Sequence, residues 1–138
     1  RPSLLPSTKE SDALKLLHRA LYENTVSPKD ARRMLPAREQ YVGVWRALER
    51  LLPSQGSTVL SYLPLLRSLS AQIGRTEPFL RSALCLEIFA ERGLLSLQHD
   101  GDAITLQRCD DGKKVRLEDS PYIQRLQAIG DGKGGDMV

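Results

Sequence analysis

The chain has 138 residues, of which 41% are hydrophobic and 27% are charged, and its formal net charge is +3. This balance is typical of one globular domain and excludes a disordered or collagen-like chain. No apolar run has the length of a membrane-spanning helix, and the first residues lack the apolar segment of a signal peptide, so we expect no membrane association. The chain starts without Met, and we expect it to be a fragment of a longer protein.

The cysteines and histidines predict neither a disulfide framework nor a metal site. Two cysteines, Cys85 and Cys109, are too few for a disulfide-stapled fold, which favours a reduced, cytoplasmic setting. Together with His18 and His99 they could supply four metal ligands, but no two of them have the spacing of a zinc motif. We therefore expect no metal and no other cofactor in this chain.

The first half of the sequence predicts three helices. Leucines at helical spacing follow Asp12, which can serve as an N-cap. Ser27, Pro28 and Asp30 are typical of the start of a short helix over 28–35. The clearest amphipathic helix begins at Pro36, and its apolar stripe consists of Tyr41, Val44, Trp45, Leu48, Leu51 and Leu52.

The middle of the sequence predicts a short strand followed by two helices. Residues 58–60 can form a very short strand. An apolar helical run then ends at Gly74, a residue suited to a left-handed C-terminal position. Thr76 is the expected N-cap of the helix over 77–92, which ends at Gly93.

After this helix the periodicity changes to that of strands. Alternating apolar pairs at Leu95/Leu97, Ile104/Leu106 and Val115/Leu117 predict a three-stranded antiparallel meander with turns at Gly101 and Gly112. Ser120 and Pro121 then start a last helix, and the glycine-rich tail 128–138 is expected to be flexible.

The order of these elements is that of a winged helix. We expect an α+β, mainly α fold with a winged-helix-like three-helix core, a small antiparallel β wing, and additional N-terminal and C-terminal helices. The predicted parts are lead-in helices over 1–34, a winged-helix-like domain over 35–127, and the tail over 128–138.

Helix 77–92 occupies the place of the DNA-reading helix of a winged helix. Apolar residues cover most of its surface, and Glu77, Glu87 and Glu91 are acids that phosphates would repel. We therefore predict that this helix is buried in the core and does not read base edges.

The candidate binding residues are basic side chains elsewhere in the sequence. They could follow a phosphate backbone, receive an acidic peptide, or only solubilise the surface. No nucleophile, phosphate-binding loop or other catalytic motif accompanies them, since His99-Asp100 fits a turn, so we expect no catalytic residue and no enzyme activity in this chain. These candidates are Arg32, Arg33, Arg38, Arg46, Arg50, Lys113, Lys114 and Arg116.

Three segments together resemble the C-terminal region of bacterial RecJ-type single-strand-specific DNA exonucleases. The first is similar to their Pro-x-Arg-Glu-aromatic helix start, the second to their leucine-rich helix ending in Gly-Leu-Leu, and the third to their closing Lys-x-x-Leu-Glu-x-Ser-Pro element. These segments are LPAREQYVGVWRALERLL (35–52), LRSALCLEIFAERGLLSL (80–97) and KKVRLEDSPYIQRL (113–126).

The resemblance implies a parent enzyme that degrades single-stranded DNA from the 5′ end in repair and recombination. It also implies that divalent metal, manganese or magnesium, is bound in an N-terminal catalytic core that contains metal-binding aspartates and an Asp-His-His motif. No Asp-His-His occurs here, so the chain would be a non-catalytic accessory domain, expected to be monomeric. Its expected partners are the parent's catalytic core and either single-stranded DNA or the acidic tail of single-strand-binding protein.

Two other functions stay open at this point. A winged-helix transcriptional regulator would bind duplex DNA tightly and dimerise on paired half-sites. A purely structural lid of the parent would show as lost stability of the parent when the domain is deleted, with unchanged DNA affinity.

Overall fold

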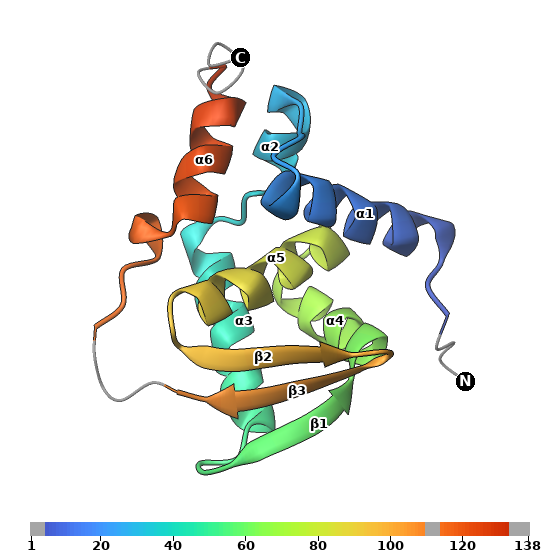
Figure 1. Ribbon diagram of the computed structural model, residues 1–138, viewed down its shortest axis with the longest axis vertical. Helices are drawn as coiled ribbons and strands as arrows, with labels where there is room; N and C mark the ends of the chain where they lie inside the picture. The colour runs from blue at the N-terminus through green and yellow to red at the C-terminus, as the bar shows by residue number, and fades with distance from the viewer. Residues whose placement is uncertain (1–4, 110–113, 133–138) are drawn as a thin grey trace.

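The computed structural model describes residues 5–109 and 114–132 (Figure 1). It is an α+β, mainly helical fold, which confirms the predicted class. The elements, in chain order, are α1 (Thr8–Tyr22), α2 (Pro28–Met34), α3 (Arg38–Leu51), β1 (Ser57–Ser61), α4 (Tyr62–Leu69), the 3-10 helix η1 (Ser70–Gln72), α5 (Pro78–Glu91), β2 (Leu95–Asp100), β3 (Ala103–Arg108), the 3-10 helix η2 (Leu117–Asp119) and α6 (Pro121–Gly130).

The sheet has three antiparallel strands in the order β1-β3-β2. The predicted short strand over 58–60 is confirmed as β1, which pairs with β3 from Ser57 opposite Gln107 to Ser61 opposite Ala103. The predicted third strand of the meander at Val115 and Leu117 is wrong, because residues 114–116 are irregular and Leu117 opens η2. The segment cannot join the sheet beside β3, because β3 already pairs with β1 on one edge and with β2 on the other.

Helix α5 lies at the centre of the molecule, between the sheet and the layer formed by α1, α2 and α6 (Figure 1). The prediction that it is buried is confirmed, since eight of its residues are buried and Leu84 and Leu86 have no exposed surface. Its arginines are also engaged: Arg81 donates to the carbonyl of Arg33 at 2.9 Å, and Arg92 pairs with Glu91 at 2.7 Å. This helix therefore presents no basic face to a DNA groove.

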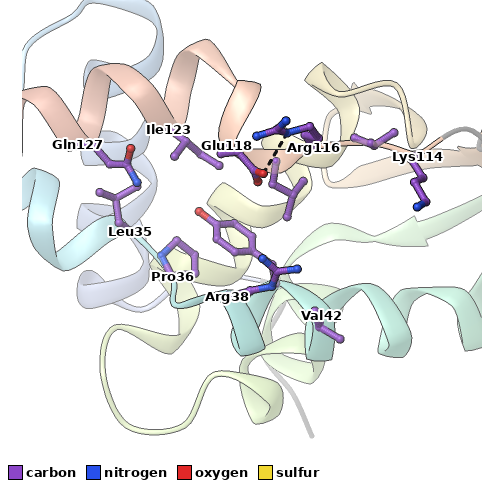
Figure 2. Close-up of a pocket in the computed structure, with 12 residues that line it drawn as sticks. Leu35, Pro36, Arg38, Val42, Lys114, Arg116, Glu118, Ile123 and Gln127 are labelled. Carbon is purple, nitrogen blue, oxygen red and sulfur yellow. Dashed lines mark hydrogen bonds and ion pairs between the residues drawn. The ribbon is translucent and has the colours of Figure 1, made fainter.

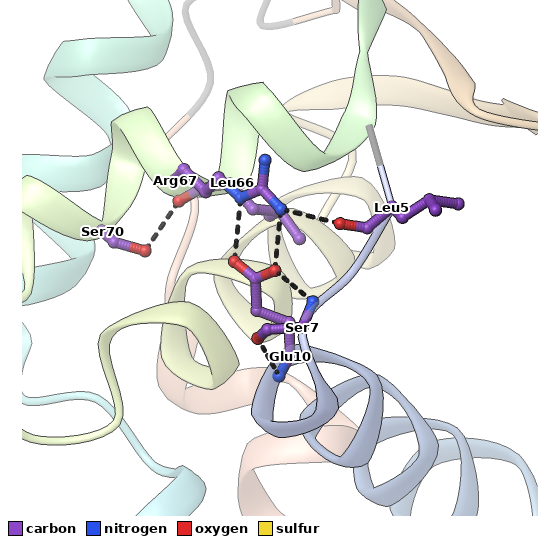
Figure 3. A network of polar contacts seen from close by, with 6 residues as sticks. All are labelled: Leu5, Ser7, Glu10, Leu66, Arg67 and Ser70. Atoms are coloured by element: carbon purple, nitrogen blue, oxygen red, sulfur yellow. Dashed lines mark hydrogen bonds and ion pairs between the residues drawn. The ribbon is translucent and has the colours of Figure 1, made fainter. Parts of the chain in front are cut away.

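Helix α1 begins earlier than Asp12, the residue predicted to cap it. Ser7 is the N-cap, and it forms a capping box in which its hydroxyl accepts from the backbone N–H of Glu10 while the Glu10 carboxylate accepts from the backbone N–H of Ser7. The same carboxylate binds Arg67 of α4 (Figure 3). The start of α1 is thereby tied to a helix far away in sequence.

The residues before 35, predicted as lead-in helices, pack on the rest of the fold. Ala20 and Leu21 of α1 and Met34 of α2 belong to the same buried core as α5. The Arg32 guanidinium donates to the carbonyl of Gly130 at 2.7 Å, and a Cβ at Gly130 would lie 3.0 Å from the Arg32 Cγ, so α2 and α6 are in close contact. Helix α6 extends to Gly130, three residues past 127, at which the predicted domain ends.

Two further details differ from the sequence predictions. Thr76 does not cap α5; the N-cap position is Glu77, which has a left-handed backbone (φ 47°) and whose side chain forms an ion pair with Arg33. Leu51, assigned to the apolar stripe of α3, is 45% exposed, whereas Leu48 and Leu52 of the same stripe are buried. In the part of the chain that the structure describes, every helix is too short or too polar to cross a lipid bilayer.

Candidate functional site

A groove of about 540 Å³ lies between the start of α3, the segment 114–118 and α6 (Figure 2). Its walls come from two stretches of the chain that are far apart in sequence, residues 35–42 and residues 114–127. The lining residues are Leu35, Pro36, Arg38, Tyr41, Val42, Lys114, Val115, Arg116, Leu117, Glu118, Ile123 and Gln127.

The α3 wall is held in place by Gln40. Its side-chain oxygen accepts from the backbone N–H of Ala37 at 2.7 Å and from Arg81 at 3.0 Å, while its amide nitrogen donates to the carbonyl of Ile73 at 2.9 Å. One side chain thus satisfies the first turn of α3 and anchors it to α5 and to the end of η1. The groove therefore has a firm wall on this side.

The opposite wall is built by η2 and α6. Ser120 is buried and is the N-cap of α6, and Pro121 takes the first helical position. The amide of Gln124 donates to the carbonyl of Glu118 at 3.1 Å, which joins η2 to the first turns of α6. Residues 114–117, which belong to the run 113–117 predicted as a strand, instead form part of a wall of the groove.

The floor of the groove is apolar. Tyr41 and Ile123 are buried, Leu117 is half-buried, and Val42 is 42% exposed on the outward side of α3. Burial raises the pKa of the Tyr41 hydroxyl well above its usual value, so the group stays protonated. Among the described residues, this buried hydroxyl has no hydrogen-bond partner. The side chains of Val42, Leu117 and Ile123 give the floor an apolar surface, which can take an apolar side chain of a ligand.

The rim of the groove is cationic. Arg38, Lys114 and Arg116 line it and are exposed, and Glu118 is the acid beside them. The Nε of Arg116 lies 3.2 Å from the Glu118 carboxylate, and both side chains are more than half exposed. Among the described residues, none forms a hydrogen bond or ion pair with the side chain of Arg38 or Lys114. Two of the three cations are thus available to an anionic ligand.

The structure brings together three of the predicted binding residues and separates the others. Arg46 and Arg50 are exposed on α3 beyond the groove. Arg32 donates to α6, and Arg33 pairs with Asp30 at 2.6 Å and with Glu77 at 3.2 Å, so both take part in contacts within the fold. Lys113 lies outside the described residues.

Several groove residues were missed by the sequence reasoning. Glu118, Ile123 and Gln127 follow the segment expected to be a strand, and the expected strand would have placed them elsewhere. Val42 offered a signal, because it is an apolar residue among the charged positions of the outward face of α3.

The histidines and cysteines of the described residues form neither a metal site nor a reactive thiol site. None of their His, Cys, Asp and Glu side chains form a group that could hold a metal ion. His99 stacks edge-on against Tyr62 with centroids 4.9 Å apart, and His18 contacts Glu23 at 3.0 Å. Cys85 and Cys109 are free, and burial raises the pKa of the Cys85 thiol, which makes it an unreactive core residue.

Comparisons of this chain with protein-family models, with curated proteins and with solved structures find no match.

Proposed function

We propose that this chain is a non-catalytic docking module of a RecJ-type single-strand exonuclease, and that its groove binds an acidic segment of a partner protein. The membership rests on the three sequence segments that resemble the C-terminal region of those enzymes. Divalent metal would then belong to the parent's catalytic core, and the setting would be the cytoplasm. The docking role rests on the groove.

The observation that carries the docking role is an apolar floor beside a cationic rim. An apolar side chain that leaves water for such a floor gains about 1.5–3 kcal/mol. Carboxylates on the same segment would meet Arg38 and Lys114, each exposed contact contributing about 0.2–1 kcal/mol. The combination favours a short segment that carries both acids and a large apolar residue, over a nucleic acid.

Nucleic acid fits this surface less well than a peptide does. Single-strand binding uses exposed aromatic rings on which bases stack, whereas the aromatic ring in the groove, that of Tyr41, is buried in the floor. Duplex reading would use α5, which is covered on both sides. An acidic protein segment is therefore the occupant we propose.

The test is a titration of the chain with a fluorescent peptide of aspartates and leucine that ends in phenylalanine. We expect binding in the micromolar range that weakens with salt, and no binding of the same peptide with lysines in place of its aspartates. Oligo-dT and a DNA duplex serve as competing ligands. Tight duplex binding would favour the regulator instead, and failure to bind the acidic peptide at low salt would refute the docking function.

Paired variants locate the site. Arg38→Ala removes a rim cation and should weaken peptide binding about three- to fivefold. Arg50→Ala removes the same charge from the same helix, outside the groove, and should change the affinity by less than about 1.5-fold at physiological salt, where charges beyond roughly 8 Å are screened. Equal effects of the two would contradict this placement of the site.

A further inference from the structure

Glu118 is the one acid among the described residues that line the groove. Its carboxylate lies at the cationic rim and reaches the guanidinium of Arg116, while Arg38 stands across the groove on α3 (Figure 2). A carboxylate in this position has the same chemistry as the acidic ligand proposed above.

The backbone under Glu118 is held in place although the side chain is exposed. Its carbonyl accepts from Gln124, and the N–H of Ser120 donates to the carbonyl of Leu117 at 2.9 Å, which closes η2. Among the described residues, Arg116 is the one side chain that forms an ion pair with the Glu118 carboxylate. The carboxylate can therefore rotate away without unfolding the wall that carries it.

The surroundings keep this carboxylate charged. Its own backbone N–H, the hydrogen bond from Arg116 and the positive charges of Arg116 and Arg38 lower the pKa of Glu118 below its usual value. At neutral pH the side chain is thus an anion placed between cations.

We infer that Glu118 is a built-in competitor, which occupies Arg116 in the empty groove and is displaced when an acidic segment binds. This inference rests on the proposed docking function and adds a specificity-determining residue to it. Because Glu118 offsets one of the three rim charges, a ligand with a single carboxylate gains little by exchanging with it. A segment with several carboxylates engages Arg38 and Lys114 as well and replaces Glu118 on Arg116.

The test compares Glu118→Gln with Glu39→Gln in the peptide titration. Both remove one negative charge from an exposed site; Glu39 is the neighbour of Arg38 on α3 but does not line the groove. We expect Glu118→Gln to raise the affinity for the acidic peptide about two- to fivefold, the range of an exposed ion pair, and Glu39→Gln to raise it less than about 1.5-fold. Equal gains would overturn the inference, because they would show a general effect of net charge.

A double-mutant cycle supplies the second readout. The gain from Glu118→Gln should fall to less than about 1.5-fold when Arg116 is replaced by Gln, since only the weaker, screened interaction of Glu118 with Arg38 is then left. A gain of undiminished size in the Arg116→Gln chain would overturn the inference while leaving the docking function intact. If the original chain does not bind the acidic peptide at low salt, the docking function itself fails and takes the inference with it.

Discussion

Replacing Glu10 by Gln removes the charge from an ion pair that joins α1 to α4 while it preserves the start of α1. The two carboxylate oxygens of Glu10 accept from Arg67 at 2.9 and 2.8 Å, and one of them also accepts from the backbone N–H of Ser7 at 2.9 Å (Figure 3). Glutamine serves as well as glutamate at the third position of a capping box. The substitution therefore isolates the charge of the carboxylate from its capping role.

The magnitude follows from the pKa of Glu10. Chiefly through the hydrogen bond from Arg67, this pKa is lowered from 4.5 to about 2. Such a difference between unfolded and folded chain corresponds to about 3 kcal/mol of folding free energy. The side chains of Arg67 and Glu10 keep 28% and 17% of their exposure, so solvent screens part of the interaction. We expect Glu10→Gln to lower the free energy of unfolding by about 1–2 kcal/mol at pH 7.

The pH dependence has a definite sign. Because the folded pKa lies below the unfolded one, the contribution is complete above about pH 4.5 and is lost as the pH falls towards 2. Urea denaturation of both chains from pH 7 to pH 2 should show a gap that closes over this interval. Glu23→Gln, at the exposed other end of α1, serves as the control and should change the stability by less than about 0.5 kcal/mol. Equal stabilities at pH 7, or a gap that stays constant down to pH 2, would refute the reasoning.

Two further substitutions probe the packing, and urea denaturation measures both. Gly130→Ala should lower the free energy of unfolding by about 1–2 kcal/mol, because the new Cβ would lie 3.0 Å from the Arg32 Cγ. At Gly43 the nearest neighbour atom would lie 3.5 Å from the new Cβ, so Gly43→Ala should be neutral or stabilise α3 by up to about 1 kcal/mol. A loss of the same size at both glycines would contradict the close contact of α2 and α6. Leu86→Ala should cost about 3–4 kcal/mol, since this side chain has no exposed surface, and Leu51→Ala, at 45% exposure, should cost less than about 1 kcal/mol. A small loss for Leu86→Ala would show that α5 does not hold the core together.

Local sequence signals predicted most elements of the fold. Ser27 and Pro28 start α2 as expected, because a hydroxyl cap and a ring-fixed φ act within one turn of the helix. Gly74 and Gly93 have positive φ at the ends of their helical segments, as glycine without a Cβ allows. The apolar coverage of helix 77–92 predicted its burial, since so much apolar surface has to leave water.

The position and lining of the groove depend on the tertiary structure and could not be predicted from local sequence signals. The run 113–117 has the alternation of a strand, yet β1, which precedes it by some fifty residues, pairs with the edge of β3 that this strand needed. Outside the sheet, residues 114–118 line the groove together with α3 and α6 and bring Lys114, Arg116 and Glu118 to the groove that Arg38 also lines. Periodicity reports which residues leave water, but it carries no information on which of two strands takes a free edge. That choice depends on packing across the whole chain, and it places the three cations on one groove.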